Sequence, residues 1–319
     1  MKKFIALLLL LSVLSAAAGC AKVLGPYYLE QEQYEEGIKV MGEQLKENPD
    51  DAASAYYVGR YYLALNEPKQ GLPYLQKAVR LSPEDADYVF WTGVAYWAMM
   101  DFDRERAAYE KAISLDPNHI SAHLYLGHGY ADRGQWAQAL KQYDVVLKLD
   151  PYNPEALYNR ARALRGLDKT SDEIAAWKRF LEYYPDGSMA MTATEQLNLH
   201  GDFTYRNFII GKRNVTLLSM AFKPGTSVLD ADGWASLEVL SALMQVNKGL
   251  VVDIVAYVKG NAPLAKARAA AIRDYMLNAH PDVDRSRLPL SWFGTAENVQ
   301  VGDKTFALDQ SVSFITEVR

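Results

Sequence analysis

The stretch HLYLGHGYADRGQWAQALKQYDVVLKLDP, residues 123–151, belongs to a periodic pattern that fills the first half of this 319-residue chain. The stretch ends in proline, and prolines recur every 34 residues, at Pro49, Pro83, Pro117, Pro151 and Pro185. Glycine keeps one position of the period, at Gly59, Gly93 and Gly127, and tyrosine keeps another, at Tyr62, Tyr96 and Tyr130. A fixed period of this length indicates an array of stacked repeats.

The unit resembles the tetratricopeptide repeat at His123, Leu126, Gly127, Tyr130, Ala139, Tyr143 and Pro151. The resemblance implies two antiparallel helices per unit, with the small residue at their contact and the proline ending the second helix because it lacks an N–H. We expect four units that end at Pro83, Pro117, Pro151 and Pro185, the last of them degenerate, with Ala161 and Leu164 in place of glycine and tyrosine. Residues 30–49 should add a preceding helix pair with a short first helix, and residues 188–199 a capping helix with a more polar outer face. The predicted array therefore covers residues 30–200, after a linker over residues 20–29.

By the same resemblance, four positions of each unit line the inner surface of a helical solenoid. Aromatic rings beside arginines at these positions suit an extended or helical peptide with apolar anchors and some acidic character. The alternative is that part of this set packs between repeats. The lysine and asparagine clamp of chaperone-binding members of the family is absent here, so a C-terminal carboxylate ligand is not supported. The predicted groove residues are Tyr56, Arg60, Phe90, Val94, Trp97, Leu124, His128, Tyr158, Arg162 and Arg165.

The N-terminus is predicted to be a signal peptide over residues 1–19. Two lysines precede an apolar run from Phe4 to Ala18, which is shorter than the ~20 residues of a spanning helix and ends in small residues. Residues 14–20 resemble the bacterial lipoprotein lipobox, and Cys20 is the only cysteine of the chain. The resemblance implies lipidation at Cys20, and Ala21 after it is typical of outer-membrane lipoproteins that face the periplasm. The alternative is an ordinary secretory signal with an incidental cysteine.

From Gly201 the periodicity changes, which predicts a second domain over residues 201–319. Strands are expected at 215–222, 250–257, 288–293 and 311–318, and helices at 234–246 and 264–279. This order predicts an α+β sandwich in which the helices cover one face of a sheet.

This second domain resembles the OmpA-like domain of envelope proteins, at residues 264–272, Arg287, Leu288 and Gly294. Members of that family bind the diaminopimelate of peptidoglycan through an aspartate after the second strand and an arginine on the next helix. Arg268 falls on that arginine, but Lys259 falls on the aspartate, and the family's late arginine pair falls near Gln310 and Ser311. We therefore expect the fold to be kept while most of the ligand chemistry is lost, because fold alone does not carry function.

Several functions are disfavoured by composition and spacing. A net charge of −5 argues against general nucleic-acid binding, which needs a basic face. One cysteine cannot form a disulfide framework or a multi-cysteine zinc site. His119 and His123 lie one turn apart, but His128 falls on another face of the helix, so we expect no metal site and no cofactor. No nucleophile elbow, phosphate loop or triad spacing is present.

These observations predict a non-catalytic, lipid-anchored scaffold of the cell envelope that binds a peptide or partner protein in its repeat groove. The alternative is a tether that binds peptidoglycan through the OmpA-like domain and recruits proteins with the repeats.

Overall fold

The computed structural model describes residues 21–318, so the predicted signal peptide and Cys20 lie outside the described residues. The chain divides into two compact units, which meet in sequence between Asn159 and Arg160. Within residues 21–318, no helix is both long and apolar enough to cross a membrane.

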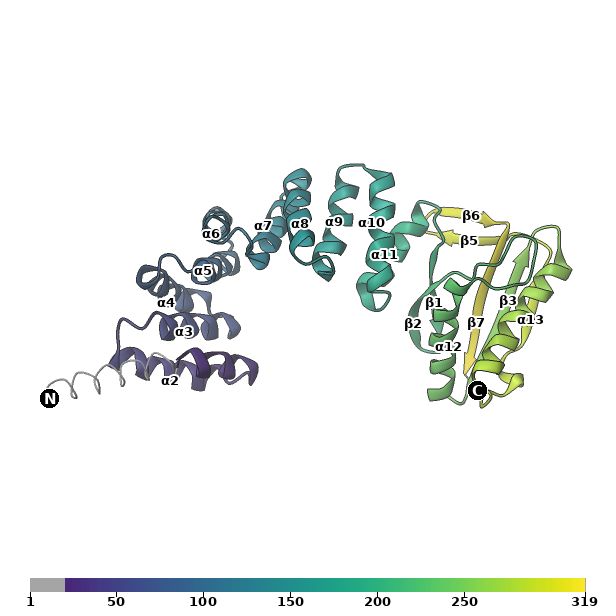
Figure 1. Cartoon of the computed structure of the whole chain (residues 1–319), viewed down its shortest axis with the longest axis horizontal. Helices are drawn as coiled ribbons and strands as arrows, with labels where there is room; N and C mark the ends of the chain where they lie inside the picture. Colours follow the sequence, from purple (N-terminus) through teal and green to yellow (C-terminus); the bar gives the residue numbers. More distant parts are fainter. Residues whose placement is uncertain (1–20, 319) are drawn as a thin grey trace, which may run out of the picture. The chain divides into compact units, whose positions relative to one another are not determined.

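The first unit is a series of antiparallel helices (Figure 1). Neighbouring helices pair as α3 with α4, α5 with α6 and α7 with α8, as the repeat pattern predicts. In each pair the second helix ends two residues before the repeating proline, for example at Leu81 before Pro83. The helices are α2 (Tyr34–Glu47), α3 (Ala52–Ala64), α4 (Pro68–Leu81), α5 (Ala86–Ala98), α6 (Phe102–Leu115), α7 (Ile120–Asp132), α8 (Trp136–Leu149) and α9 (Pro154–Gly166), which continues into the second unit.

The repeating glycine brings the two helices of a pair close together. A Cβ atom on Gly93 would lie 2.5 Å from the ring of Tyr109, and one on Gly127 would lie 2.7 Å from the ring of Tyr143. Both tyrosines are fully buried. The pattern of a glycine in the first helix and an aromatic residue in the second therefore encodes a direct contact between the backbone of one helix and a ring of the other.

Residues 21–30 are helical, where a linker was expected. Ala21 is fully buried, and Leu24, Tyr28 and Leu29 pack against the core of the first repeat. The Tyr61 hydroxyl donates a hydrogen bond to the Gly25 carbonyl oxygen at 3.0 Å. These apolar residues share one face of a helix, which makes this segment the first helix of the pair that ends at Pro49.

The second unit begins with helices and continues into an α+β fold (Figure 1). The α+β fold was expected from the sequence, whereas the division between the two parts was expected after residue 200 and not at Arg160. The predicted capping helix forms, and it packs against β1 and β2 as well as α10, so it joins the helices of this unit to the β1–β2 hairpin. Asn198 donates hydrogen bonds to the carbonyl oxygens of Asp202 and Tyr205, both at 2.8 Å. The elements are α10 (Thr170–Tyr183), α11 (Gly187–Leu199), β1 (Tyr205–Ile210), β2 (Arg213–Leu218), η1 (Ala231–Gly233), α12 (Trp234–Val246), β3 (Leu250–Val258), α13 (Ala262–Ala279), η2 (Arg285–Arg287), β4 (Leu290–Phe293), β5 (Glu297–Val301), β6 (Lys304–Leu308) and β7 (Gln310–Val318).

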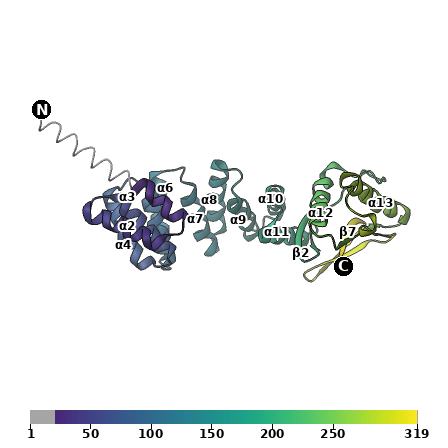
Figure 2. The ribbon, with the colours of Figure 1, turned by 90° about the horizontal axis from the view of Figure 1, so that it is seen from below.

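The central sheet has the order β4, β3, β7, with β4 parallel and β7 antiparallel to β3. The β1–β2 hairpin lies beside β7, where the Gly211 N–H donates to the Thr316 hydroxyl at 3.0 Å. Alternate residues of β3, among them Val252 and Ile254, share one apolar core with α12 and α13. Figure 2 shows both helices on the same side of β7. Strand β1 and the β5–β6 hairpin were not predicted from the sequence.

Candidate protein-binding surface

Three of the predicted groove residues belong to the core of the array. Tyr56, Phe90 and Leu124 are 7%, 3% and 7% exposed, which leaves almost no surface for a ligand. The centroid of the Phe90 ring lies 5.5 Å from that of Tyr109 and 5.3 Å from that of Tyr125. The expectation that these three side chains face an open groove is therefore corrected, because they fill the space between helices.

Arg60 lies at the centre of a group of aromatic side chains on α3 and α5. Its guanidinium carbon is 3.4 Å from the centroid of the Trp91 ring, and its Nη1 donates to the Tyr56 hydroxyl at 2.6 Å. Tyr56 stacks on Tyr88 with centroids 4.6 Å apart, and it meets Tyr57 edge to face at 4.9 Å. We call Tyr56, Tyr57, Arg60, Tyr88 and Trp91 the Arg60 cluster.

The electrostatics of the Arg60 cluster favour an anionic partner group. Burial raises the pKa of Tyr56 to about 12, against the opposing effect of Arg60, and it also raises the pKa of Tyr88 to about 12. Both phenols therefore keep their protons at neutral pH. Arg60 has five N–H donors and forms no ion pair within residues 21–318. The charge of Asp87 acts on it, since the pKa of Asp87 is lowered by His119 and, to a smaller extent, by Arg60. A half-buried cation stacked on a ring is suited to a partner carboxylate with an apolar or aromatic neighbour.

Sequence reasoning found Tyr56 and Arg60 but missed Tyr57, Tyr88 and Trp91. All three missed side chains are partly buried rather than fully exposed. Tyr57 precedes Arg60 by three residues, and Tyr88 precedes Trp91 by three, a spacing that places each pair on one helix face. This three-residue spacing is the feature of the sequence that could have assigned the missed side chains to the Arg60 cluster.

Apolar side chains are exposed at the turn between α5 and α6. Trp97 is 52% exposed, Met100 75% and Phe102 47%, while the predicted groove residue Val94 is half-buried. The Arg133 guanidinium lies 5.4 Å from the Phe102 ring and donates to the Phe102 carbonyl oxygen at 3.2 Å. Trp97 is the predicted residue with the most accessible ring.

The three histidines of α7 and its N-cap have separate partners. The hydrogen bond between His119 and Asp87, 3.1 Å long, raises the pKa of His119 and lowers that of Asp87. His123 contacts the Gln142 side chain at 2.7 Å and the Pro117 carbonyl oxygen at 3.0 Å.

His128 lies 3.8 Å from the carboxylate of Glu155 and 3.3 Å from the amide nitrogen of Asn159. Among the described residues, no group of histidine, cysteine, aspartate or glutamate side chains is placed to hold a metal ion.

Helix α9 carries the last three predicted groove residues. Tyr158, in the first unit, is half-buried. Arg162 and Arg165, in the second unit, are exposed.

The two predicted peptidoglycan-binding positions engage other residues of the chain. Arg268 is only 4% exposed, and it donates to the Thr226 carbonyl oxygen at 3.0 Å and to the Gln310 side chain at 2.7 Å. Desolvation lowers its pKa. Lys259 is exposed and forms an ion pair with Asp309 at 3.1 Å. Arg268 therefore acts as a structural link between α13, β7 and the loop at Thr226.

Comparison with protein families agrees with the geometry of the array. Tetratricopeptide-repeat family models match residues 23–69, 59–120 and 155–187, and a TPR repeat model matches residues 127–166. The helical array therefore consists of tetratricopeptide repeats.

Several solved structures are similar to this chain. A structure of pilF from Pseudomonas aeruginosa is 16% identical to this chain, with a TM-score of 0.54. The match covers 59% of this chain and 86% of the pilF chain. A MamA protein is 18% identical, with a TM-score of 0.47 and coverage of 58% and 96%. YrrB, described as a TPR protein with an unusual peptide-binding site, is 19% identical, with a TM-score of 0.46 and coverage of 54% and 88%. No curated protein matches the chain.

Proposed function

We propose that this protein is a non-catalytic scaffold of the bacterial cell envelope, which is anchored by lipid on Cys20 and binds a peptide or protein partner on its repeat array. The observation that supports it most is the Arg60 cluster, where a cation that forms no ion pair with any described residue lies against aromatic rings. Tyrosine, tryptophan and arginine are the residues that dominate binding energy at protein interfaces. The exposed Trp97 provides a further apolar anchor.

Replacement of Arg60 by methionine and of Trp97 by alanine should each weaken partner capture by roughly 1–4 kcal/mol. Methionine keeps much of the apolar stem of Arg60 but removes the cation, and Trp97 is too exposed for its loss to unfold the array. The measurement is crosslinking of the full-length protein in its own envelope, followed by affinity purification and quantitative mass spectrometry. Lys111→Ala, an exposed position on α6, is the control. Equal recovery of the partner by both folded variants and the control would contradict binding on this surface.

Replacement of Cys20 by alanine should abolish palmitate labelling and move the protein from the membrane fraction to the soluble periplasmic fraction. Acyl chains contribute ~0.8 kcal/mol per buried methylene, and no helix of the described part is suited to spanning the bilayer. The measurement is fractionation with an immunoblot, and Ser15→Ala, within the predicted signal peptide, is the control. Retention of Cys20→Ala in the membrane fraction after a high-salt wash would show that lipid is not the main anchor.

We do not extend this function to peptidoglycan. A diaminopimelate group needs a cation for its carboxylate and an acceptor for its ammonium. Here the donors of Arg268 are directed at Thr226 and Gln310, and Lys259 supplies a cation where an acceptor is required. Among the described residues of the second unit, no contact favours the tether over the scaffold.

A further inference from the structure

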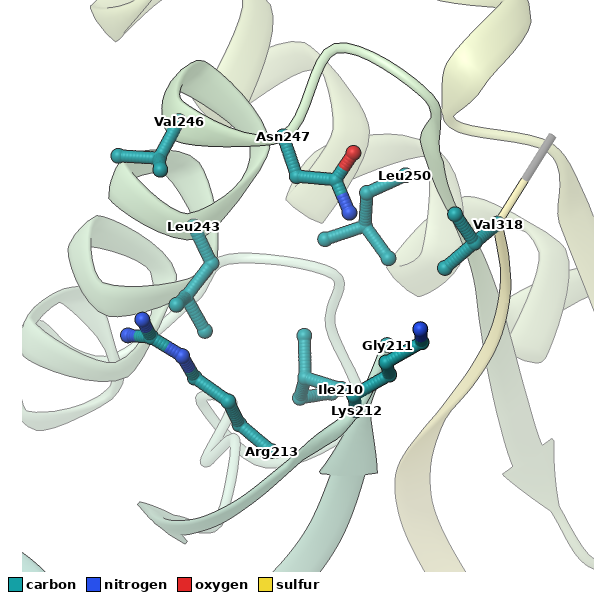
Figure 3. A pocket seen from close by; sticks show the side chains of 9 residues that line it. All are labelled: Ile210, Gly211, Lys212, Arg213, Leu243, Val246, Asn247, Leu250 and Val318. Atoms are coloured by element: carbon teal, nitrogen blue, oxygen red, sulfur yellow. The ribbon is translucent and has the colours of Figure 1, made fainter.

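A hollow of about 320 Å³ opens at one end of the central sheet in the second unit (Figure 3). The β1–β2 turn, the last turn of α12 and the adjoining ends of β3 and β7 surround it. Its lining is apolar, with Leu250 almost fully buried at 2% exposure, Val318 at 48% and Val246 at 83%. Val246 and Val318 therefore leave apolar surface at the rim, and a hollow of this kind can accept an apolar group.

The walls of the hollow are held in place by hydrogen bonds. Arg287 donates to the carbonyl oxygens of Met244, Asn247 and Leu250, at 2.9, 2.7 and 2.9 Å. These bonds satisfy acceptors at the C-terminal end of α12 and tie it to the start of β3. On the other side, the hydrogen bond from Gly211 to Thr316 fixes the β1–β2 turn to β7. The hollow is therefore preformed, and little ordering is needed for a ligand to bind.

Two cations flank the opening. Lys212 and Arg213 are exposed, and their side chains extend toward opposite sides of the hollow (Figure 3). Neither forms an ion pair or a side-chain hydrogen bond within residues 21–318. Some other exposed cations of the same unit are paired with carboxylates, as Lys259 is with Asp309 and Arg285 with Asp274, whereas Lys223 also forms no ion pair within the described residues. An apolar hollow with two unpaired cations at its rim complements an apolar group that carries negative charge next to it.

We propose that this hollow is a second protein-docking site, which takes an aliphatic side chain of a partner segment while neighbouring carboxylates of that segment contact Lys212 and Arg213. The volume is at the lower end of the range of ligand pockets, which suits one or two side chains better than a long acyl chain or a cofactor. The site is separate in sequence from the Arg60 cluster. It would give the scaffold a second point of attachment, and two linked contacts bind more tightly than either alone.

The test uses a short synthetic peptide with two leucines between glutamates, added to residues 20–319 with Cys20→Ala, which carries no lipid and has ¹³C-labelled Leu and Val methyl groups. We expect saturable shifts of the Val246, Leu250 and Val318 methyl signals. A peptide with glutamines in place of the glutamates should bind roughly tenfold more weakly, because two exposed charge pairs contribute up to ~1 kcal/mol each. The double variant Lys212→Glu/Arg213→Glu should lose binding to a similar or greater extent. Lys223→Glu, an exposed lysine outside the lining, should bind like the unmodified chain.

Three outcomes would overturn the inference. The first is the absence of shifts at these methyl groups at millimolar peptide. The second is equal binding of the glutamate and glutamine peptides, which would remove the role of the two cations. The third is binding of decanoate at the same methyl groups without binding of the peptide, which would identify a site for lipid carboxylates. Capture of the envelope partner through the Arg60 cluster is measured separately, so failure here leaves that function unaffected.

Discussion

Replacing Arg206 with methionine is expected to lower the free energy of unfolding of the α+β fold by about 3–5 kcal/mol. Arg206 and Glu297 are each only 9% exposed, and two parallel hydrogen bonds join them, from Nη1 to Oε2 and from Nη2 to Oε1, both 2.9 Å long. Nη1 also approaches the Val312 carbonyl oxygen at 3.3 Å. Loss of the guanidinium would leave the buried Glu297 carboxylate without its counter-charge, which is the costly way to break such a pair.

The Arg206–Glu297 pair also makes the free energy of unfolding of the α+β fold depend on pH. Burial raises the pKa of Glu297, but the hydrogen bond and charge of Arg206 outweigh it, so the pKa is lowered from the ordinary value of 4.5. The stabilisation is therefore present above pH 4.5 and is lost as the pH falls through the lower pKa of the folded state. In Arg206→Met, the free energy of unfolding should no longer fall in this way as the pH drops below 4.5.

The measurement is amide hydrogen exchange of the full-length chain at β1, β5 and β7. It reports the free energy of opening of these strands separately from that of the first unit. The control is Lys248→Met, since the Lys248–Asp282 pair is exposed and 3.8 Å long and should contribute below ~1 kcal/mol. The double variant Arg206→Met/Glu297→Leu should recover most of the loss, because removing both charges avoids the unpaired one. If Arg206→Met lowers the free energy of unfolding by less than ~0.5 kcal/mol, the Arg206–Glu297 pair does not stabilise the fold as proposed.

Replacing Tyr109 with alanine should destabilise the repeat array by about 3–5 kcal/mol, the usual cost of deleting a buried large aromatic ring. The ring is fully buried against Gly93 and lies 5.5 Å from Phe90 and 6.0 Å from Tyr125. It therefore joins the two helices of one repeat and the first helix of the next. Because repeats depend on their neighbours, we expect loss of helicity around α5, α6 and α7 first, measured by hydrogen exchange at those helices.

Tyr109→Phe is the matched variant and should be neutral or stabilising. The Tyr109 hydroxyl is buried and has no hydrogen-bond partner in the described part of the chain, and burial strongly raises its pKa. An unsatisfied buried polar group costs ~1–3 kcal/mol, which phenylalanine would not incur. An equal loss of stability in Tyr109→Phe and Tyr109→Ala would mean that the hydroxyl, rather than the packing of the ring, supports the array.

The groove prediction failed where burial depends on neighbouring helices. The repeat register placed Tyr56, Phe90 and Leu124 on the first helix of each unit, and that placement is consistent with the structure. Rings of the next repeat help to cover Tyr56 and Phe90, as the Tyr56–Tyr88 and Phe90–Tyr125 contacts illustrate. A single helix cannot reveal which of its faces another helix will cover.

The missed strands have a similar cause. Residues 205–210 alternate between buried and exposed, but the run is short and contains Arg206 at a buried position, so it does not read as a core strand. The β5–β6 hairpin mixes polar and apolar residues, and its buried Glu297 is paired with Arg206, 91 residues away. Short strands with buried charges give a weak periodic signal, because what satisfies the charge lies elsewhere in the chain.

The sequence by itself determined the helical repeats, since a proline, a glycine and an aromatic residue recurring every 34 residues are local requirements of helix ends and helix contacts. It also determined the order of the main helices and strands of the second unit, through their apolar periodicity. Only the tertiary structure decided which side chains remain free to bind. Arg60 faces Trp91 without an ion pair, Arg268 is buried, and Lys212 flanks an apolar hollow. Each of these outcomes depends on residues distant in sequence, because exposure and charge pairing arise from packing between elements rather than within one.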